Sequence, residues 1–335
     1  MRVVAALDKF RGTATAAEAA AAVGSAGWEL GHDVDEVPMS DGGEGLLDVL
    51  GGPNRTSVVT GPLGAPVPAP WRIAQRTAVI EMARASGLDL AGGAEGNDPL
   101  AASTIGTGEL IDRALAEGAR RVIVGLGGSA TTDGGLGALE ALRRSPARFR
   151  SVELEIACDV RTRFVDAAAV FAPQKGASPA QVSLLTARLE QLARRYRDEF
   201  DIDVTTLDGS GAAGGLAGAL AALGGRIVPG FELVAEHVDL DERVAAADVV
   251  VTGEGYLDAQ SLDGKVVGGV CELATAAGKP AIVVAGDADP DVAADLASAG
   301  ATVVSLVERY GEERARREPR WCIEAAVSDA LRALG

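Results

Sequence analysis

The chain has 335 residues, of which 47% are hydrophobic and 24% are charged, and its formal net charge is −17. This composition is ordinary for a globular protein, and the length suggests two domains. Because so acidic a chain repels nucleic acid and anionic membranes, we expect neither as a partner.

The cysteines and the apolar segments indicate a cytoplasmic protein. Cys158, Cys271 and Cys322 lie far apart and lack the spacing of a zinc site or a disulfide framework, which fits a reducing compartment. No segment approaches the ~18 apolar residues of a membrane span. The first apolar stretch is too short for the core of a signal peptide.

The first third of the chain combines β-α units with hairpins. Residues 2–7 and 34–39 read as strands, and residues 15–30 read as a helix that begins with a capping box, Thr15 and Glu18. This β-α-β order favours a parallel sheet. Residues 56–90 hold several prolines and short β-prone runs, a texture typical of hairpins.

The rest of the chain returns to β-α units. Helices are predicted at residues 106–119, 136–144, 178–200 and 319–334, and strands at 120–125, 151–160, 247–253, 279–286 and 301–307. We expect an α/β fold with two α/β domains and a cleft between them. One would be a Rossmann-like parallel sheet built from both chain ends, residues 1–56 plus 236–335. The other would be an inserted mixed α/β domain, residues 57–235.

Glycine-rich turns are the main candidates for chemistry. They occupy residues 40–45, 125–135, 209–215 and 252–255. Consecutive glycines let backbone amides approach an anion closely, and carboxylates next to them suit a magnesium ion. This combination is what phosphoryl transfer requires. The structural alternative is that the glycines serve tight turns and the acids cap helices.

Positive charges in loops and a glycine pattern add two further hypotheses. Lys9 with Arg11, Lys175 and Lys265 are candidates for binding a substrate carboxylate or phosphate. No Walker A motif occurs, but Gly209–Gly214 match GxGxxG and residues 125–130 match the looser GxGxxA. A dinucleotide-dependent dehydrogenase is therefore an alternative.

Six motifs together resemble the bacterial glycerate kinase family. They are DGGEG (41–45), GGSATTDGG (127–135), ACDV (157–160), PQKGA (173–177), GAAGG (211–215) and TGEGYLDAQSLDGK (252–265). Their order matches that of the family, and the resemblance covers essentially the whole chain. It implies a kinase with two α/β domains that transfers a phosphoryl group from ATP, with magnesium, to a hydroxyl of D-glycerate.

The chain departs from the family pattern at four places, one of which is a condensed stretch between CDV and PQKGA. DKFRG replaces the usual D-S-F/Y-K, so that Lys9 stands where serine is expected and Arg11 replaces lysine. RTRF follows ACDV where the family has x-N-P-L, and the segment between Leu142 and Val152 is shorter. Two alternatives follow: a kinase for another small hydroxy acid, or a non-catalytic ligand-binding protein of the same fold.

We assign roles to the motif residues as a hypothesis, in a protein that could also be a homodimer. The ligands of magnesium would come from Asp41, Asp133 and Glu254. The acceptor carboxylate would bind Arg11, Lys175 or Lys265, and Asp133, Asp159 or Asp258 would orient the attacking hydroxyl. The nucleotide phosphates would contact the turns at Gly42, Gly43, Gly45, Gly127, Gly128, Ser129, Thr131, Gly134 and Gly253.

Overall fold

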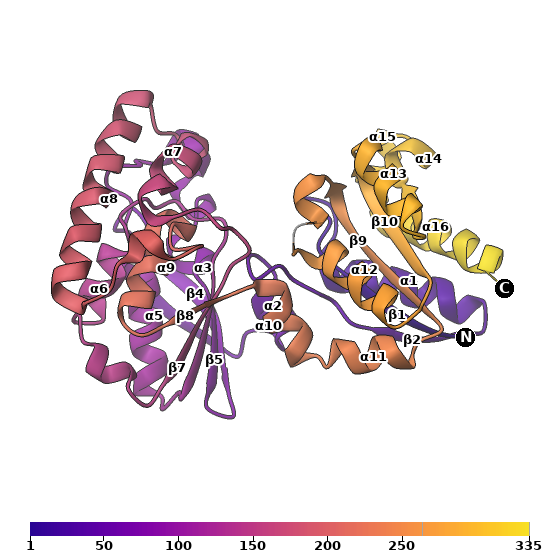
Figure 1. Ribbon diagram of the computed structural model, residues 1–335, viewed down its shortest axis with the longest axis horizontal. Helices are drawn as coiled ribbons and strands as arrows, with labels where there is room; N and C mark the ends of the chain where they lie inside the picture. The colour runs from indigo at the N-terminus through magenta and orange to yellow at the C-terminus, as the bar shows by residue number, and fades with distance from the viewer. Residues whose placement is uncertain (263, 335) are drawn as a thin grey trace. The chain divides into compact units, whose positions relative to one another are not determined.

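The protein divides into two compact units, seen here in a computed structural model. Unit 1 comprises Met1–Asp41 and the chain from Phe231 on, and unit 2 comprises Gly42–Gly230. The structure describes residues 1–262 and 264–334; Asp263 of the LDGK segment and Gly335 of the expected Rossmann-like domain lie outside the described residues. Figure 1 shows both chain ends in unit 1. Residues 42–56 pack with unit 2, whereas the sequence had suggested a boundary after residue 56.

Unit 1 is built on a five-stranded parallel sheet with the order β11-β10-β9-β1-β2. The strands are β1 (Arg2–Leu7), β2 (Asp33–Glu36), β9 (Val249–Leu257), β10 (Ala281–Ala288) and β11 (Thr302–Ser305). The predicted parallel sheet from both chain ends is confirmed. The second strand ends at Glu36, three residues earlier than predicted.

Helices cover both faces of this sheet. On one face, α1 and α16 pack against β1, β9 and β10, with Val23 and Ile323 in the shared core. On the other face, α12 and α13 pack against β9 and β10. The predicted capping box starts α1, because Thr15 Oγ1 accepts from the Glu18 N–H at 3.2 Å and Glu18 accepts from the Thr15 N–H at 2.9 Å. The helices are α1 (Ala16–Glu29), α10 (Gly230–His237), α11 (Leu240–Ala246), α12 (Val266–Ala276), α13 (Pro290–Ser298), α14 (Leu306–Tyr310), α15 (Glu312–Arg317) and α16 (Pro319–Leu334).

Unit 2 holds a six-stranded mixed sheet with the order β3-β4-β5-β6-β7-β8. The predicted hairpins are present, because β3, β4 and β5 pair antiparallel. From β5 to β8 the pairing is parallel. The strands are β3 (Arg55–Thr60), β4 (Pro66–Ala74), β5 (Thr77–Glu81), β6 (Arg121–Gly125), β7 (Glu153–Ala157) and β8 (Arg226–Val228).

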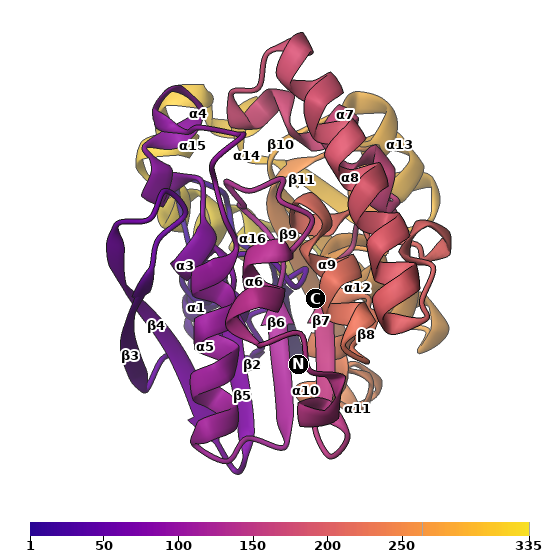
Figure 2. The same ribbon diagram turned by 90° about the vertical axis from the view of Figure 1, so that its left-hand side faces the viewer.

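The helices of unit 2 enclose one large apolar core. Figure 2 shows α5 and α6 lying over the strands, and their leucines share this core with Trp71, Phe164 and Tyr196. The helices are α2 (Leu46–Val49), α3 (Ala83–Ser86), α4 (Gly93–Gly96), α5 (Ile105–Ala116), α6 (Leu136–Ala141), α7 (Ala167–Phe171), α8 (Pro179–Phe200) and α9 (Ala212–Ala222). Within the described part of the chain, no helix is long and apolar enough to cross a membrane.

The GxGxxG pattern lacks the setting of a dinucleotide site. A dinucleotide fingerprint must join a strand directly to a helix, but the turn at Gly209–Gly214 follows the 3₁₀ turn Val204–Thr206. Ala213, Gly214 and Gly215 have φ values of 51°, 67° and 95°. A Cβ at Gly214 would lie 2.1 Å from the carbonyl oxygen of Thr131. This glycine therefore serves the close packing of two backbone segments.

Candidate active site

Two carboxylates emerge side by side from neighbouring parallel strands of unit 1. Leu7 of β1 and Gly253 of β9 are register partners, and the Asp8 N–H donates to the Gly253 carbonyl at 2.9 Å. Asp8 directly follows β1, and Glu254 is the residue of β9 that follows Gly253. Because parallel strands present their carboxyl ends at one edge of the sheet, both acids lie where α/β proteins bind ligands.

Burial raises the pKa values of both acids toward neutral pH. Burial raises the pKa of Asp8 to about 6, with Lys9 lowering it and Asp41 raising it. Burial also raises the pKa of Glu254 to about 7, against a hydrogen bond with Ser261 that lowers it. Glu254 Oε1 is buried and has no hydrogen-bond partner among the described residues. Such an acceptor is suited to a ligand that supplies a proton or a cation.

Cations surround the acid pair. Lys9 Nζ lies 3.5 Å from Asp8 Oδ1 and 3.4 Å from Asp41 Oδ1. Burial lowers the pKa of Lys9, but the two carboxylates outweigh this and the pKa is raised overall. Lys265, at the N-cap of α12, lowers the pKa of Glu254.

The loop that carries Arg11 packs directly on β9. A Cβ at Gly255 would lie 2.9 Å from the Arg11 backbone nitrogen. The structure thus brings Arg11, Asp41, Glu254 and Lys265, which the sequence had singled out, to one edge of the unit 1 sheet.

Two other predicted residues of unit 1 have structural reasons for their identity. Asp258 Oδ1 accepts from the N–H of Gln260 at 2.8 Å and of Ser261 at 3.2 Å, so it caps the following 3₁₀ turn. A Cβ at Gly253 would lie 2.0 Å from the carbonyl oxygen of Val284. Their assignments to the attacking hydroxyl and to the nucleotide stay predictions.

In unit 2 the predicted turns pack against one another at the carboxyl ends of β6 and β7. A Cβ at Gly127 would lie 3.0 Å from the Gly43 Cα, and one at Gly42 would lie 2.7 Å from the Gly230 Cα. Gly128 has a φ of 61°. Asp159 Oδ1 accepts from the Gly230 N–H at 2.6 Å. The turns at 42–45 and 125–135 are therefore neighbours, as expected for motifs of one site.

Asp133 ties together the starts of two helices. Its Oδ2 accepts from the N–H and the hydroxyl of Thr104, both at 2.8 Å, and from the Gly137 N–H at 3.2 Å. Its Oδ1 accepts from the Gly135 N–H at 3.0 Å. Thr104 is the N-cap of α5 and Gly135 the N-cap of α6. This position explains Asp133 as a structural cap; its catalytic and metal roles stay predictions.

Lys175 holds the glycine-rich loop from inside. It is 3% exposed, and its Nζ donates to Ser129 Oγ at 2.8 Å and to the Thr131 carbonyl at 2.6 Å. Burial lowers its pKa to about 7, although Asp133 acts in the opposite direction. Because Lys175 is buried and bonded to the loop, its predicted contact with an acceptor carboxylate finds no support in this geometry and stays a prediction.

Two residues of functional interest were missed by the sequence analysis: Asp8 and Glu81. Asp8 could have been found, because it directly follows the predicted strand at residues 2–7. Glu81 is 1% exposed and accepts from the N–H groups of Gly45 at 2.9 Å and Leu47 at 2.8 Å. The Gly45 amide, predicted to hold phosphate, thus already has an anionic partner.

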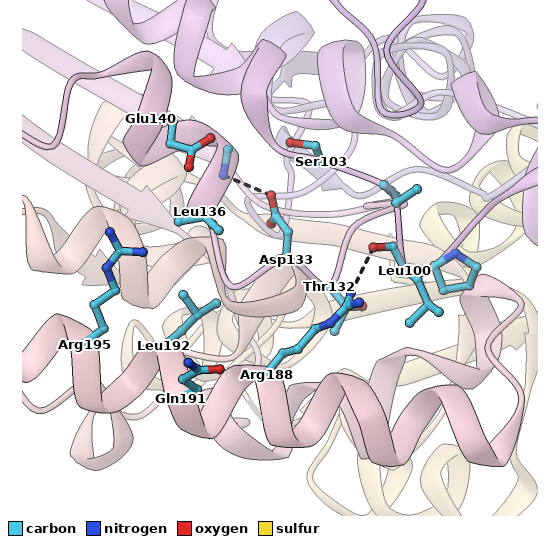
Figure 3. A pocket seen from close by; sticks show the side chains of 14 residues that line it. Leu100, Ser103, Thr132, Asp133, Leu136, Glu140, Arg188, Gln191, Leu192 and Arg195 are labelled. Carbon is cyan, nitrogen blue, oxygen red and sulfur yellow. Dashed lines mark hydrogen bonds between the residues drawn. The ribbon is translucent and has the colours of Figure 1, made fainter.

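Gly134 of the glycine-rich loop contacts the core of unit 2, and a cavity lies beside the same loop. The Gly134 carbonyl accepts from the Tyr196 hydroxyl at 2.8 Å. Beside Thr132 and Asp133 lies a cavity of about 440 Å³, whose opposite wall is α8 (Figure 3). All of its lining residues belong to unit 2.

Buried acids, lysines and glycine-rich turns at the carboxyl ends of parallel strands define a class, the α/β proteins that act on small anionic ligands. Comparison with known proteins identifies the family. The model of the glycerate kinase family matches residues 3–145 and 142–334. The chain belongs to the glycerate kinase family, which confirms the resemblance seen in its motifs.

Named relatives and a solved structure agree with this assignment. Glycerate 2-kinase of Escherichia coli strain K12 is 38% identical over 331 residues, with 87% of each chain covered. Glycerate kinase of Halalkalibacterium halodurans is 38% identical, with 85% of each chain covered. A crystal structure described as glycerate kinase 2 from Salmonella typhimurium LT2 has a TM-score of 0.82 and 32% identity, and the match covers 100% of this chain and 99% of that one.

The first prediction separates a structural from a catalytic role of Asp133. Asp133→Asn places an amide N–H₂ among backbone donors, so we expect a loss of about 1–3 kcal/mol in the free energy of unfolding. Urea unfolding and turnover are measured together, with the exposed Asp89→Asn as the matched control. Turnover lost by orders of magnitude at unchanged stability would show that Asp133 acts in catalysis.

The second prediction concerns Lys175. Because its pKa in the folded state is about 7 instead of 10.5, the wild-type protein gains stability as pH rises between these values. Lys175→Met leaves two loop acceptors unpaired but removes the cost of burying a charge. We therefore expect the variant to lose more stability at pH 9 than at pH 6, measured by urea unfolding. Lys279→Met is the control, and an equal loss at both pH values would contradict the expectation.

Proposed function

We propose that this protein is an ATP-dependent kinase that phosphorylates a hydroxyl of D-glycerate with the aid of Mg²⁺. The observation that carries the proposal is the pair of buried Asp8 and half-buried Glu254, in a chain that belongs to the glycerate kinase family. A pair of acids with pKa values of about 6 and 7 can accept a proton at neutral pH.

Carboxylate oxygens at this edge suit Mg²⁺. Glu254 Oε1 is a buried acceptor without a partner among the described residues, and carboxylate oxygens are hard ligands of the kind Mg²⁺ prefers. No cluster of three or more potential ligands was found in residues 1–262 and 264–334. Mg²⁺ usually binds one or two carboxylates together with substrate phosphates and water. We assign Glu254 to this role, and a bound Mg²⁺ would offset the charge on the transferred phosphoryl group.

The cations bind the negatively charged parts of the substrates. Lys265 stands at the N-terminus of α12, where free backbone amides favour a phosphate. Arg11 is exposed beside β9 and can pair with the carboxylate of the acceptor. Lys9 keeps Asp8 and Asp41 in place through its two ion pairs.

The chemical step is a direct transfer. The acceptor hydroxyl oxygen forms a bond to the γ-phosphorus while the bond from that phosphorus to the β-γ bridging oxygen breaks, and ADP leaves. The hydroxyl proton passes to the Asp8 carboxylate, whose pKa is raised to about 6 by burial. The name of the Escherichia coli relative, glycerate 2-kinase, supports 2-phosphoglycerate as the product.

One assay of ADP release distinguishes glycerate from other acceptor acids. Three free cysteines support work in a reducing cytoplasm, and a homodimer stays a prediction. A small hydroxy acid other than glycerate is the second candidate, because Lys9 and Arg11 depart from the family pattern beside the acid pair. A dehydrogenase finds no support in the turn at Gly209–Gly214, which does not follow a strand.

The third prediction is D-glycerate-dependent release of ADP from ATP and Mg²⁺. L-glycerate, tartronate and a reaction without acceptor are run beside it, and ³¹P NMR identifies the product. We expect Asp8→Asn and Glu254→Gln to lower kcat by about 10²-fold or more, and the exposed Glu272→Gln to leave it unchanged. Activity with another acid alone would indicate a different substrate, and nucleotide binding without ADP release would indicate a binding protein.

The fourth prediction uses the pKa of Glu254. Because this pKa is raised from 4.5 to about 7 in the folded state, the wild-type protein loses stability as pH rises through this range. We expect Glu254→Gln to be more stable than the wild type at pH 8, by at most about 3 kcal/mol, and little different at pH 5.

Urea unfolding with EDTA measures this effect, and Glu272→Gln is again the control. Added Mg²⁺ should stabilise the wild type at pH 8 but not Glu254→Gln. Equal stabilisation of both proteins by Mg²⁺ would exclude Glu254 as its ligand.

A further inference from the structure

The glycine-rich loop at residues 125–135 has no role in the kinase chemistry proposed above, and its conformation is fixed from two sides. On one side the loop pairs with residues 86–88. The Leu88 N–H donates to the Gly128 carbonyl at 2.8 Å, and the Ala130 N–H donates to the Ser86 carbonyl at 3.0 Å.

On the other side, two side chains reach three consecutive residues of the loop. Asn97 Nδ2 donates to the Ala130 carbonyl at 3.0 Å. Lys175 Nζ donates to Ser129 Oγ at 2.8 Å and to the Thr131 carbonyl at 2.6 Å. Asn97 Nδ2 also donates to the Lys175 carbonyl at 2.9 Å. The two side chains are therefore linked to each other as well as to the loop.

Close packing brings Lys175 to this place. Gly176 has a φ of 92°, and a Cβ there would lie 2.2 Å from the carbonyl oxygen of Ala94 in α4. Asn97 is the C-cap of the same helix. The PQKGA segment thus lies against the helix that ends at Asn97, which explains how the Asn97 amide reaches the Lys175 carbonyl.

The first N–H groups of the loop are left without acceptors. The described chain contains no cis peptide bond, so the N–H and the C=O of each peptide point in opposite directions. Because the Gly128 carbonyl points to Leu88, the Ser129 N–H points away from it. In the part of the chain that the structure describes, no acceptor is found for the N–H groups of Gly127, Gly128 and Ser129. Gly128 is exposed with a φ of 61°, and successive N–H groups at such a turn suit an anion.

We propose that Asn97 and Lys175 are positioning residues of the nucleotide site, which hold the loop so that the N–H groups of Gly127, Gly128 and Ser129 meet a phosphate of ATP. This inference rests on the proposed kinase function, because ATP is its phosphoryl donor. Neither side chain needs to touch the nucleotide. Lys175 is 3% exposed, and Asn97 uses its amide nitrogen on two carbonyls.

The loop depends on these donors because its carbonyls are buried. Ala130 and Thr131 are both 0% exposed, so water does not replace a lost partner without a rearrangement of the backbone. A buried carbonyl that loses its donor is costly. Without Asn97 or Lys175 the loop would therefore shift, and its free N–H groups would lose the direction in which they meet the phosphate.

Isothermal titration of the full chain with ATP and Mg²⁺, without acceptor, tests the inference together with steady-state kinetics. We expect Asn97→Ala to weaken ATP binding and to raise the KM for ATP about tenfold, with the KM for D-glycerate unchanged. Lys175→Met removes two bonds to the same loop and should change ATP binding in the same direction.

Asn54→Ala is the matched control for a structural role. The Asn54 side chain also makes two hydrogen bonds within unit 2, donating to the Ile73 carbonyl at 3.0 Å and accepting from the Ile73 N–H at 3.0 Å. We expect this variant to lose stability but to keep the wild-type KM for ATP. Urea unfolding of each variant shows whether it is folded at the temperature of the assay.

An unchanged affinity for ATP in both Asn97→Ala and Lys175→Met would overturn the inference. An equal loss of affinity in Asn54→Ala would overturn it as well, because general destabilisation would then explain the effect. A wild type that binds no ATP would overturn both this inference and the kinase function. A wild type that binds ATP without D-glycerate-dependent turnover would overturn the kinase function alone, and the titrations of the variants would still decide the role of Asn97 and Lys175.

Discussion

A buried carboxylate must receive hydrogen-bond donors or a cation, and this constraint orders both units of the protein. In unit 2, Glu81 and Asp133 stand at or after the ends of parallel strands, and backbone amides satisfy them. In unit 1, Glu254 lies on β9, and one of its oxygens has no hydrogen-bond partner among the residues that the structure describes. The same residue type at the same edge of a sheet is thus structural in one unit and available for chemistry in the other.

The glycine-rich turns follow from this constraint. Gly135 has a φ of 74°, a backbone conformation that favours glycine, and in it the N–H reaches Asp133 Oδ1. Gly214 leaves room for the Thr131 carbonyl, which in turn accepts from Lys175. Much of the glycine content therefore serves to fold the loop around its own acids and lysine, and phosphate is not needed to explain it.

Local patterns predicted the fold well, because they depend on periodicity and on caps. Residues 319–334 form α16 as predicted, and the Thr15 capping box is present. The sequence could not predict which acids already have hydrogen-bond partners, because the partners of Asp133 include Thr104, 29 residues away. Lys175 is charged and lies in a short loop, so its burial could not be foreseen either. The motifs identified the family, but only tertiary contacts separate capping acids from unpartnered ones.

The acid pair of unit 1 also links stability to function. Burial disfavours the charged forms of Asp8 and Glu254, so that keeping them ionised above their raised pKa values lowers the free energy of unfolding. A cation bound at Glu254 would offset the cost of burying its charge. The stability that the protein loses by keeping these carboxylates ionised would then contribute to its affinity for the cation. Active sites commonly trade stability for function in this way.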